Sequence, residues 1–224
     1  MDGTTKLFHF FTFSLFHFFT YTNCVLSISI RQQIKQVETE IVTAYISIGS
    51  NLGDRAGNLL LAVRGLMEAS FSVNKLSAIY ETEPKGVEGQ PPFLNMVAEI
   101  KLTSITASQM MARMLRIEYL LGRRDKNLKK PRTVDLDLLL FGSYTCDTDF
   151  LTLPHPRMFE RRFVLTPFAE IAPHVVNPTS KKTIAEMLTE ADDFSIVKRW
   201  NPNKKQKLEK KDSKVILKTR VQDA

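Results

Sequence analysis

The feature that most constrains this chain is an apolar stretch that carries two aspartates. The stretch runs from 131 to 142 (PRTVDLDLLLFG) and predicts a β-strand, because it is rich in apolar and branched residues and is bounded by proline and glycine. Successive side chains of a strand point to opposite faces, so Asp135 and Asp137 share one face and Leu136 and Leu138 share the other. The sequence therefore predicts two neighbouring carboxylates on an otherwise apolar strand.

Two carboxylates on one strand face repel each other and resist burial. A divalent cation would neutralise them, and oxygen ligands at this spacing suit Mg²⁺, which commonly takes one or two carboxylates and completes its shell with substrate phosphates. The alternative is an edge strand with two solvated aspartates, and the motif alone leaves both interpretations open. Arg132 favours the metal site, because a guanidinium complements a phosphate bound to the same metal.

A basic loop leads into this strand. The segment 122–132 (GRRDKNLKKPR) contains six cations, and cations beside two carboxylates are typical of a site that binds a polyphosphate with its metal ions. A second irregular loop, at 81–92, is rich in glycine and proline. Irregular loops of this length in compact domains are often binding loops.

The strand expected after the second loop, at 93–101, carries a candidate ligand-binding pair. Phe93 and Asn95 are two residues apart and so share a face. An aromatic ring and an amide on one face suit a flat heteroaromatic ligand, which can stack on the ring and hydrogen-bond along its edge. In the alternative interpretation, Phe93 belongs to the core and Asn95 is a polar residue at the strand edge.

The rest of the chain alternates between short strands and amphipathic helices. Strands are expected at 44–48 and 72–80, and helices at 55–68, 106–121, 163–171 and 183–188. Asp54 is placed to cap the first of these helices. Its expected core-facing stripe consists of Leu59, Leu60, Val63, Leu66 and Met67. The methionine-rich stripe of the helix at 106–121 is also interpreted as core, and Trp200 is expected to pack against the domain.

Two further polar residues stand out. Glu118 lies near the C-terminal end of a predicted helix, where the helix dipole disfavours a carboxylate, and this misfit weakly indicates a functional role. His155 is held between Pro154 and Pro156. A single histidine is more often structural, but one fixed in a turn near a phosphate site could donate a hydrogen bond to an anion.

Composition sets the broad class of the chain. With 224 residues it is long enough for one domain with appendages. Its two cysteines, Cys24 and Cys146, form no CxxC motif, so a reducing cytoplasm is expected rather than a disulfide framework or zinc site. Ten basic and three acidic residues at 198–224 account for the net charge of +7. Such a basic tail can contact anionic surfaces, but it is more often solvated and disordered.

Residues 1–42 differ in character from the rest. The run at 7–30 is apolar and crowded with aromatic residues, and it loosely resembles a signal peptide or membrane anchor. Three interpretations stay open: an anchor or signal, an upstream extension from a wrongly assigned start, and a poorly ordered appendage. We therefore expect the folded domain at 43–202 and a basic, disordered tail at 203–224.

Several short motifs occur in order within the domain. They are IGSNLG (48–53), YETEP (80–84), FLN (93–95), GR (122–123), PRxxDLD (131–137) and PH followed by arginine (154–161). Each motif is weak alone, but the ordered set resembles the 6-hydroxymethyl-7,8-dihydropterin pyrophosphokinase family of folate biosynthesis. Phe93 stands where some members have tyrosine, and Lys129-Lys130 stands where some have an aromatic-glycine pair, so the phosphate-binding loop lysine, such as Lys126, stays unassigned.

The resemblance implies an α+β fold: a single ferredoxin-like domain whose antiparallel sheet has helices packed on it. It implies transfer of the β,γ-pyrophosphoryl group of ATP to the hydroxymethyl group of the pterin, with release of AMP. By position in the motifs, Asp135 and Asp137 would bind two Mg²⁺ ions, and the catalytic residues would be Arg123, Arg132 and His155.

The resemblance also implies two binding sites. ATP would be bound by Glu118, Arg123, Arg132, Leu138, Thr152, His155 and Arg161. The pterin would be bound by Thr82, Lys85 (through its backbone), Phe93, Asn95 and Phe163, with the two phenylalanines on either side of the ring. ATP and the pterin are the expected partners, and the domain is expected to be a monomer without nucleic-acid or membrane partners.

Two other functions compete with this one. A nucleic-acid-binding ferredoxin-like module would expose aromatic residues on its sheet, and an acidic pair there would repel phosphate. A different Mg²⁺-dependent phosphoryl or nucleotidyl transferase would share the metal site but release different products. The reaction products therefore discriminate between the candidate enzymes.

Overall fold

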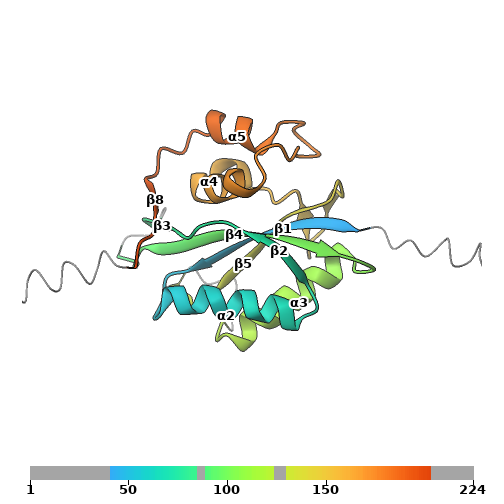
Figure 1. The fold of residues 1–224 in the computed structure, drawn as a ribbon. Coiled ribbons are helices and arrows are strands. Elements are labelled where there is room, and N and C mark those ends of the chain that lie inside the picture. Colours follow the sequence, from blue (N-terminus) through green and yellow to red (C-terminus); the bar gives the residue numbers. More distant parts are fainter. Residues whose placement is uncertain (1–40, 85–88, 124–129, 203–224) are drawn as a thin grey trace, which may run out of the picture. The chain divides into compact units, whose positions relative to one another are not determined.

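A six-stranded antiparallel sheet forms the centre of the computed structural model, which describes residues 41–84, 89–123 and 130–202 (Figure 1). The strands of this sheet are β1 (Val42–Ser50), β2 (Ser72–Leu76), β3 (Tyr80–Thr82), β4 (Phe93–Leu102), β5 (Asp135–Phe141) and β8 (Val197–Arg199). A separate two-stranded sheet consists of β6 (Cys146–Asp147) and β7 (Thr152–Leu153).

The strand order β5-β1-β4-β3-β8, with β2 also paired to β4, confirms the expected ferredoxin-like α+β fold. The single strand expected at 72–80 was partly wrong: β2 covers its first half, residues 77–79 are not in a strand, and β3 begins at Tyr80 and pairs with the next part of β4. Between β2 and β3, side chains replace backbone partners: the Val97 N–H of β4 donates to Ser77 Oγ at 2.9 Å, and the Ala78 N–H donates to Glu170 Oε2 at 2.8 Å. β8, which the sequence did not predict, pairs with the outer edge of β3.

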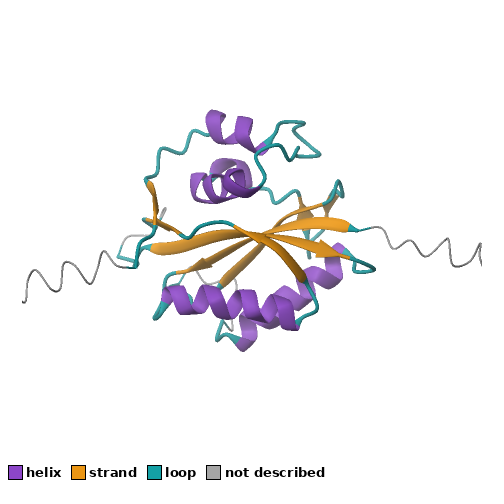
Figure 2. Ribbon diagram, viewed as in Figure 1, coloured by secondary structure: helices purple, strands orange, loops and turns teal. Residues whose placement is uncertain are grey.

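Helices cover both faces of the sheet (Figures 1 and 2). α2 (Arg55–Glu68) and α3 (Ala107–Leu120) pack on one face, and α4 (Arg162–Ile171) packs on the other with α5 (Ile184–Glu190) outside it. A short 3₁₀ helix, η1 (Met158–Glu160), precedes α4. The predicted cap of α2 is confirmed, since Asp54 Oδ1 accepts from the Gly57 N–H at 3.0 Å.

Two apolar clusters, one on each face, hold these layers together. The cluster between the sheet and α2/α3 includes Met110 and Met114, which confirms that the methionine stripe is core. The prediction for α2 was partly wrong, because Leu60 and Met67 are 64% and 61% exposed. The buried positions of α2 are Leu59, Ala62, Val63 and Leu66, which follow the i, i+3, i+4, i+7 spacing of one helix face and exclude both residues.

The aspartate strand is shorter than its sequence suggested, because β5 begins at Asp135 rather than at Pro131. The preceding backbone is bonded elsewhere: the Arg132 N–H donates to Asn51 Oδ1 at 2.7 Å, and Thr133 Oγ1 donates to the Leu121 carbonyl at 2.6 Å. The predicted alternation is confirmed, since Leu136 and Leu138 are buried in the α2/α3 cluster.

The C-terminal end of the described chain returns to the sheet. The Trp200 N–H donates to the Ile79 carbonyl at 2.8 Å, and the side chain packs against the α2/α3 cluster, as expected. The predictions for residues 1–40, Lys85, Lys126 and 203–224 lie outside the described residues. Within the described ranges, the structure has no helix with the length and apolar character that crossing a membrane requires.

Candidate active site

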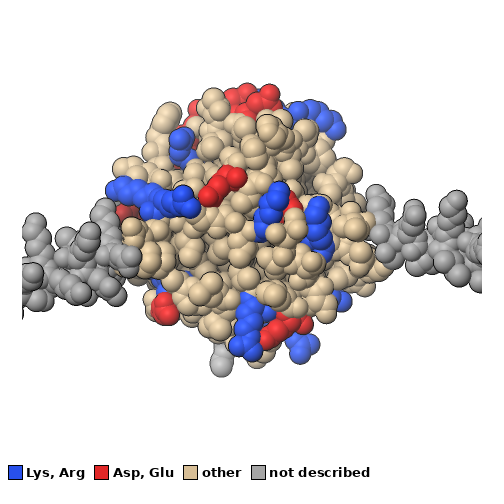
Figure 3. All heavy atoms as spheres, viewed as in Figure 1, with Lys and Arg blue, Asp and Glu red and all other residues tan. Residues whose placement is uncertain are grey.

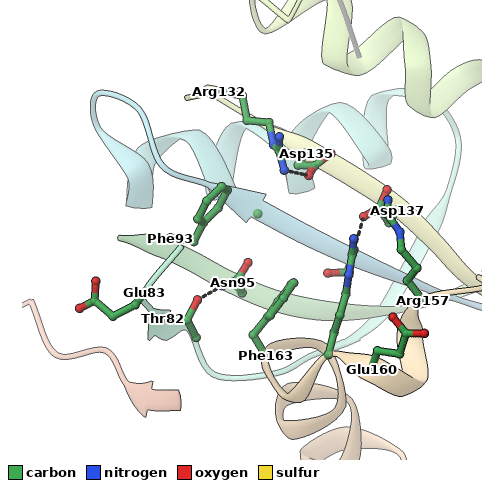
Figure 4. A pocket seen from close by; sticks show the side chains of 13 residues that line it. Thr82, Glu83, Phe93, Asn95, Arg132, Asp135, Asp137, Arg157, Glu160 and Phe163 are labelled. Carbon is green, nitrogen blue, oxygen red and sulfur yellow. Dashed lines mark hydrogen bonds and ion pairs between the residues drawn. The ribbon is translucent and has the colours of Figure 1, made fainter. Parts of the chain in front are cut away.

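A cavity of about 280 Å³ opens on the face of the sheet that carries α4 (Figure 4). This volume is near the lower end of the range of about 300–1,000 Å³ that is usual for small-molecule sites. Strands β1, β3, β4 and β5 form its floor, and the segment around η1 and the start of α4 forms one wall. The lining residues are Ser47, Gly49, Thr82, Glu83, Phe93, Asn95, Arg132, Asp135, Asp137, Arg157, Glu160, Arg161 and Phe163.

The two aspartates of β5 face one end of this cavity and are surrounded by arginines. Asp135 forms ion pairs with Arg123 and, at 2.7 Å, with Arg132. Arg161 Nη1 lies 3.7 Å from Asp137 Oδ2. β5 is an edge strand, as the alternative interpretation expected, but its carboxylates are paired and only 16% and 22% exposed rather than solvated.

The Glu118 side chain, on α3, holds two groups next to the aspartates in place. Its side chain is almost fully buried, and Oε1 accepts from Arg123 Nη1 at 2.6 Å and from the Leu136 N–H at 2.8 Å. The carboxylate therefore holds both the Arg123 guanidinium and the backbone between the two aspartates. These contacts give a physical reason for a carboxylate at the disfavoured end of α3.

The surroundings of Arg123 and Arg161 shift the pKa values of these two guanidinium groups in opposite directions. Burial lowers the pKa of Arg123, but the nearby carboxylates of Asp135 and Glu118 outweigh it and raise the pKa above its usual value. Burial, and then the positive charge of Arg157, lower the pKa of Arg161 despite the opposing effect of Asp137. Both groups are cations at neutral pH, because a guanidinium is not deprotonated in proteins.

The other end of the cavity is aromatic and amide-lined. Asn95 Nδ2 donates to Thr82 Oγ1 at 2.9 Å, and both side chains are buried. The rings of Phe93 and Phe163 project into the cavity on either side of this pair (Figure 4). Gly49 on β1 makes room, because a Cβ there would lie 3.1 Å from Asn95 Oδ1.

Arg132 connects the two ends. Its guanidinium lies 5.3 Å from the centroid of the Phe93 ring and also pairs with Asp135. Its Nε is buried and has no hydrogen-bond partner among the described residues. A buried donor of this kind beside a cavity suits an acceptor that a bound ligand would supply.

Five of the seven residues expected at the nucleotide site do not line the cavity. Glu118 and Arg123 contact the β5 residues Leu136 and Asp135, and the other three are bonded or buried elsewhere. His155 Nδ1 accepts from the Arg157 N–H at 3.2 Å, Thr152 Oγ1 donates to Asp147 Oδ1 at 2.9 Å, and Leu138 is buried in the α2/α3 cluster. The His155 N–H donates to the Leu139 carbonyl at 2.9 Å, so its turn is attached to β5 just beyond Asp137. Their assignments as ATP-binding residues remain predictions.

Several cavity residues were missed from the sequence. Glu83, Arg157 and Glu160 line the cavity, and Asn51 fixes its border through hydrogen bonds to the Arg132 backbone and to Gln90 Oε1. Asn51 lies in the IGSNLG motif and Arg157 directly follows the predicted His155 turn. A place within or next to a motif was thus the sequence signal that could have identified both residues as part of the site.

The chemistry of the donors fits a magnesium ion. Asp135 and Asp137 present carboxylate oxygens to the cavity from one strand face. Among residues 41–84, 89–123 and 130–202, no group of three or more His, Cys, Asp or Glu side chains forms a complete metal cage. Two carboxylates with room for other oxygen ligands match the way in which Mg²⁺ usually binds, with substrate phosphates and water completing its shell.

Comparisons with known proteins agree with this geometry. Residues 45–173 match the family model described as 7,8-dihydro-6-hydroxymethylpterin-pyrophosphokinase (HPPK). The 2-amino-4-hydroxy-6-hydroxymethyldihydropteridine pyrophosphokinase of Bacillus subtilis is 49% identical over 133 residues, which cover 59% of this chain and 79% of that protein. The enzyme of the same name from Aquifex aeolicus is 34% identical over 150 residues, which cover 67% of this chain and 92% of that protein.

Solved structures share the fold. The wild-type HPPK-DHPS of Plasmodium falciparum with SDX-DHP has a TM-score of 0.56 and 13% sequence identity. The match covers 69% of this chain but only 45% of that longer chain. At this identity the likeness concerns the fold alone.

Proposed function

The chain belongs to the 7,8-dihydro-6-hydroxymethylpterin-pyrophosphokinase family, and on this basis we propose that it transfers the β,γ-pyrophosphoryl group of ATP to 6-hydroxymethyl-7,8-dihydropterin. The products are AMP and the pterin diphosphate, a step of folate biosynthesis. The observation that carries the proposal is a single cavity with an aromatic, amide-lined end and a carboxylate- and arginine-lined end. Each end matches one half of the reaction.

The aromatic end would bind the pterin. Phe93 and Phe163 are placed to stack on the two faces of a flat ring, because both line the cavity and project into it (Figure 4). Asn95 and Thr82 offer hydrogen-bonding groups to the ring edge, and their mutual hydrogen bond at 2.9 Å fixes the orientation of the amide. Lys85 is proposed to contribute only through its backbone.

The charged end would bind magnesium and the phosphates of ATP. We assign Asp135 and Asp137 as ligands of two Mg²⁺ ions, which supply charge neutralisation of the phosphates when bound. Arg123, Arg132 and Arg161 are assigned to phosphate oxygens, because each is a cation at or beneath the cavity floor next to these carboxylates. The unpartnered Nε of Arg132 supports this assignment.

Four of the residues expected at the nucleotide site would act from outside the cavity: Glu118, Leu138, Thr152 and His155. Glu118 acts through Arg123, which it contacts at 2.6 Å. His155 and Thr152 lie beside β5, beyond the cavity, where the nucleoside part of ATP would extend. Leu138 would contribute through its backbone, because its side chain is in the core.

The reaction requires positioning more than covalent chemistry from the protein. The hydroxymethyl oxygen of the pterin attacks the β-phosphorus of ATP and loses its proton to solvent. The bond from the β-phosphorus to the α,β-bridging oxygen breaks, and AMP leaves with that oxygen. The arginines stabilise charge that develops on the phosphate oxygens, while the stacked ring holds the hydroxyl in line.

The competing functions receive less support. On the face shown in Figure 3, basic and acidic side chains are interspersed among neutral ones. The carboxylates of Asp135 and Asp137 on the floor of the cavity would repel a nucleic-acid backbone. We also propose that the domain acts as a monomer in the cytoplasm, with ATP and the pterin as its partners.

The test is an assay of nucleotide products. The chain is incubated with Mg²⁺, ATP and 6-hydroxymethyl-7,8-dihydropterin, and nucleotides are separated by chromatography. We expect AMP to form only when the pterin is present. Formation of ADP, or of free pyrophosphate, would instead assign the chain to another class of transferase.

A further inference from the structure

Arg157 is a charged cavity residue to which neither the motifs nor the assignments above give a role. It lies in the turn between His155 and η1, lines the cavity, and projects toward Asp137 in the charged end (Figure 4). Its backbone is held on both sides: the N–H donates to His155 Nδ1 at 3.2 Å, and the carbonyl accepts from Glu160 N at 3.3 Å. The base of this long side chain is therefore fixed at the cavity wall.

The other arginines of this end are already matched with carboxylates. Arg123 pairs with Glu118 and Asp135, Arg132 pairs with Asp135, and Arg161 approaches Asp137. In the described ranges, the Arg157 guanidinium takes part in no ion pair, although it faces the same cavity. An exposed arginine is often simply solvated, but this one adds positive charge where three arginines already gather, which costs energy unless an anion binds there.

We infer that Arg157 binds the terminal phosphates of ATP, which are the part that is transferred. This inference rests on the proposed function, because only that reaction places a pyrophosphoryl group at the boundary between the two ends of the cavity. Arg157 lies on the Asp137 side, away from Thr82 and Asn95 (Figure 4). A guanidinium in this position can donate to oxygens of the β- and γ-phosphates both before and after transfer.

From this location we predict that only ligands carrying the transferred phosphates depend on Arg157 for binding. ATP and the pterin diphosphate both carry the transferred phosphates, whereas AMP does not. Binding of the first two should therefore depend on Arg157, and binding of AMP should not. A general electrostatic attraction by the protein surface would weaken all three together.

The experiment compares Arg157→Ala and Arg157→Lys with a matched control, Arg116→Ala. Arg116 is an exposed arginine of α3, outside the cavity lining. Dissociation constants for Mg·ATP, the pterin diphosphate and AMP are measured by calorimetry on the full chain, and circular dichroism confirms folding. We expect Arg157→Ala to weaken Mg·ATP and the pterin diphosphate about tenfold, as for loss of a charge-assisted hydrogen bond, and to leave AMP unchanged.

The controls separate this inference from the function on which it rests. Arg157→Lys should restore part of the affinity, because it keeps the charge but not the planar fork. Equal affinities in Arg157→Ala and Arg116→Ala, or an equal loss for AMP, would overturn the inference. The wild-type product assay is run in parallel: if AMP does not form there, the proposed function fails, whereas normal turnover with unaltered binding by Arg157→Ala overturns the role of Arg157 alone.

Discussion

The Asn51 side chain holds the backbone of Arg132 in place. Asn51 Oδ1 accepts from the Arg132 N–H at 2.7 Å, and the Asn51 N–H donates to the Arg132 carbonyl at 3.1 Å. Asn51 Nδ2 also donates to Gln90 Oε1 at 3.1 Å, so one buried amide joins two segments that border the cavity. The position of the Arg132 guanidinium between Phe93 and Asp135 depends on this link.

Asn51→Ala should therefore impair both stability and turnover. The substitution leaves the Arg132 N–H without its acceptor, and an unsatisfied buried group typically costs about 1–3 kcal/mol. We expect a loss of this size in urea unfolding and about a tenfold fall in kcat/KM. Asn58→Ala is the control, because the Asn58 side chain donates to Ser50 Oγ and to the Leu52 carbonyl, and neither residue lines the cavity. Equal kinetic effects of the two variants would exclude a positioning role for Asn51.

Glu118→Ala should be strongly destabilising. It removes the acceptor of the Leu136 N–H and a partner of the buried Arg123 guanidinium, and breaking a buried ion pair costs about 3–5 kcal/mol. The matched control is Glu68→Ala, which breaks an exposed pair with Arg64 at 2.7 Å, where a loss of only about 0–1 kcal/mol is expected. Free energies of unfolding in urea give the comparison. Similar values for the two variants would show that Glu118 does not organise the site.

A pH effect is expected from Glu99, a buried carboxylate at the far end of β4 from Asn95. Burial alone raises the pKa of Glu99, but hydrogen bonds from Asn74 and Tyr45 and the charge of Lys75 outweigh it and lower the pKa below its ordinary 4.5. A lowered folded-state pKa stabilises the fold above the unfolded-state value, and this contribution is lost as the pH falls through the folded value.

The wild-type chain should thus lose stability as the pH falls below about 4.5. Glu99→Gln lacks the titrating group, so its free energy of unfolding should change less over the same acid range, although it starts lower at neutral pH. Urea titrations at a series of pH values measure both curves. Parallel curves would show that Glu99 does not contribute to acid unfolding.

Gly49→Ala should act on pterin binding. The new Cβ would lie 3.1 Å from Asn95 Oδ1 and 3.7 Å from Asp135 Cβ, so the amide must shift away from its place on the floor. We expect KM for the pterin to rise several-fold while KM for ATP changes little. Steady-state kinetics with each substrate varied in turn would measure this. A larger effect on ATP than on the pterin would contradict the assignment of the two ends.

The sequence predicted the residues that follow simple periodic rules. Asp135 and Asp137 share a face, as do Phe93 and Asn95, because a strand alternates strictly, and all four line the cavity as expected. Leu60 was misplaced because a run of adjacent leucines does not reveal which ones face the sheet. The break between β2 and β3 could not be foreseen, since the side chains of Ser77 and of Glu170 on a distant helix take up backbone N–H groups there.

For Asn51 and Arg157 the sequence offered only a place in or beside a motif, and it did not show what they contact. Asn51 acts through contacts with Arg132 and Gln90, which lie 81 and 39 residues away along the chain. Arg157 looks like any exposed arginine until the fold places it at the wall of the cavity. Tertiary contacts of this kind have no local pattern, so only the folded structure shows them.

The most direct test follows the β-phosphorus of ATP. The chain is incubated with ATP labelled at that atom, Mg²⁺ and 6-hydroxymethyl-7,8-dihydropterin, and the labelled products are separated and identified. We predict that the label leaves the nucleotide and appears in the pterin diphosphate, and that Asp137→Ala folds normally but transfers no label. Label retained in ADP, label released as free pyrophosphate, or normal transfer by Asp137→Ala would contradict the proposed reaction and its metal site.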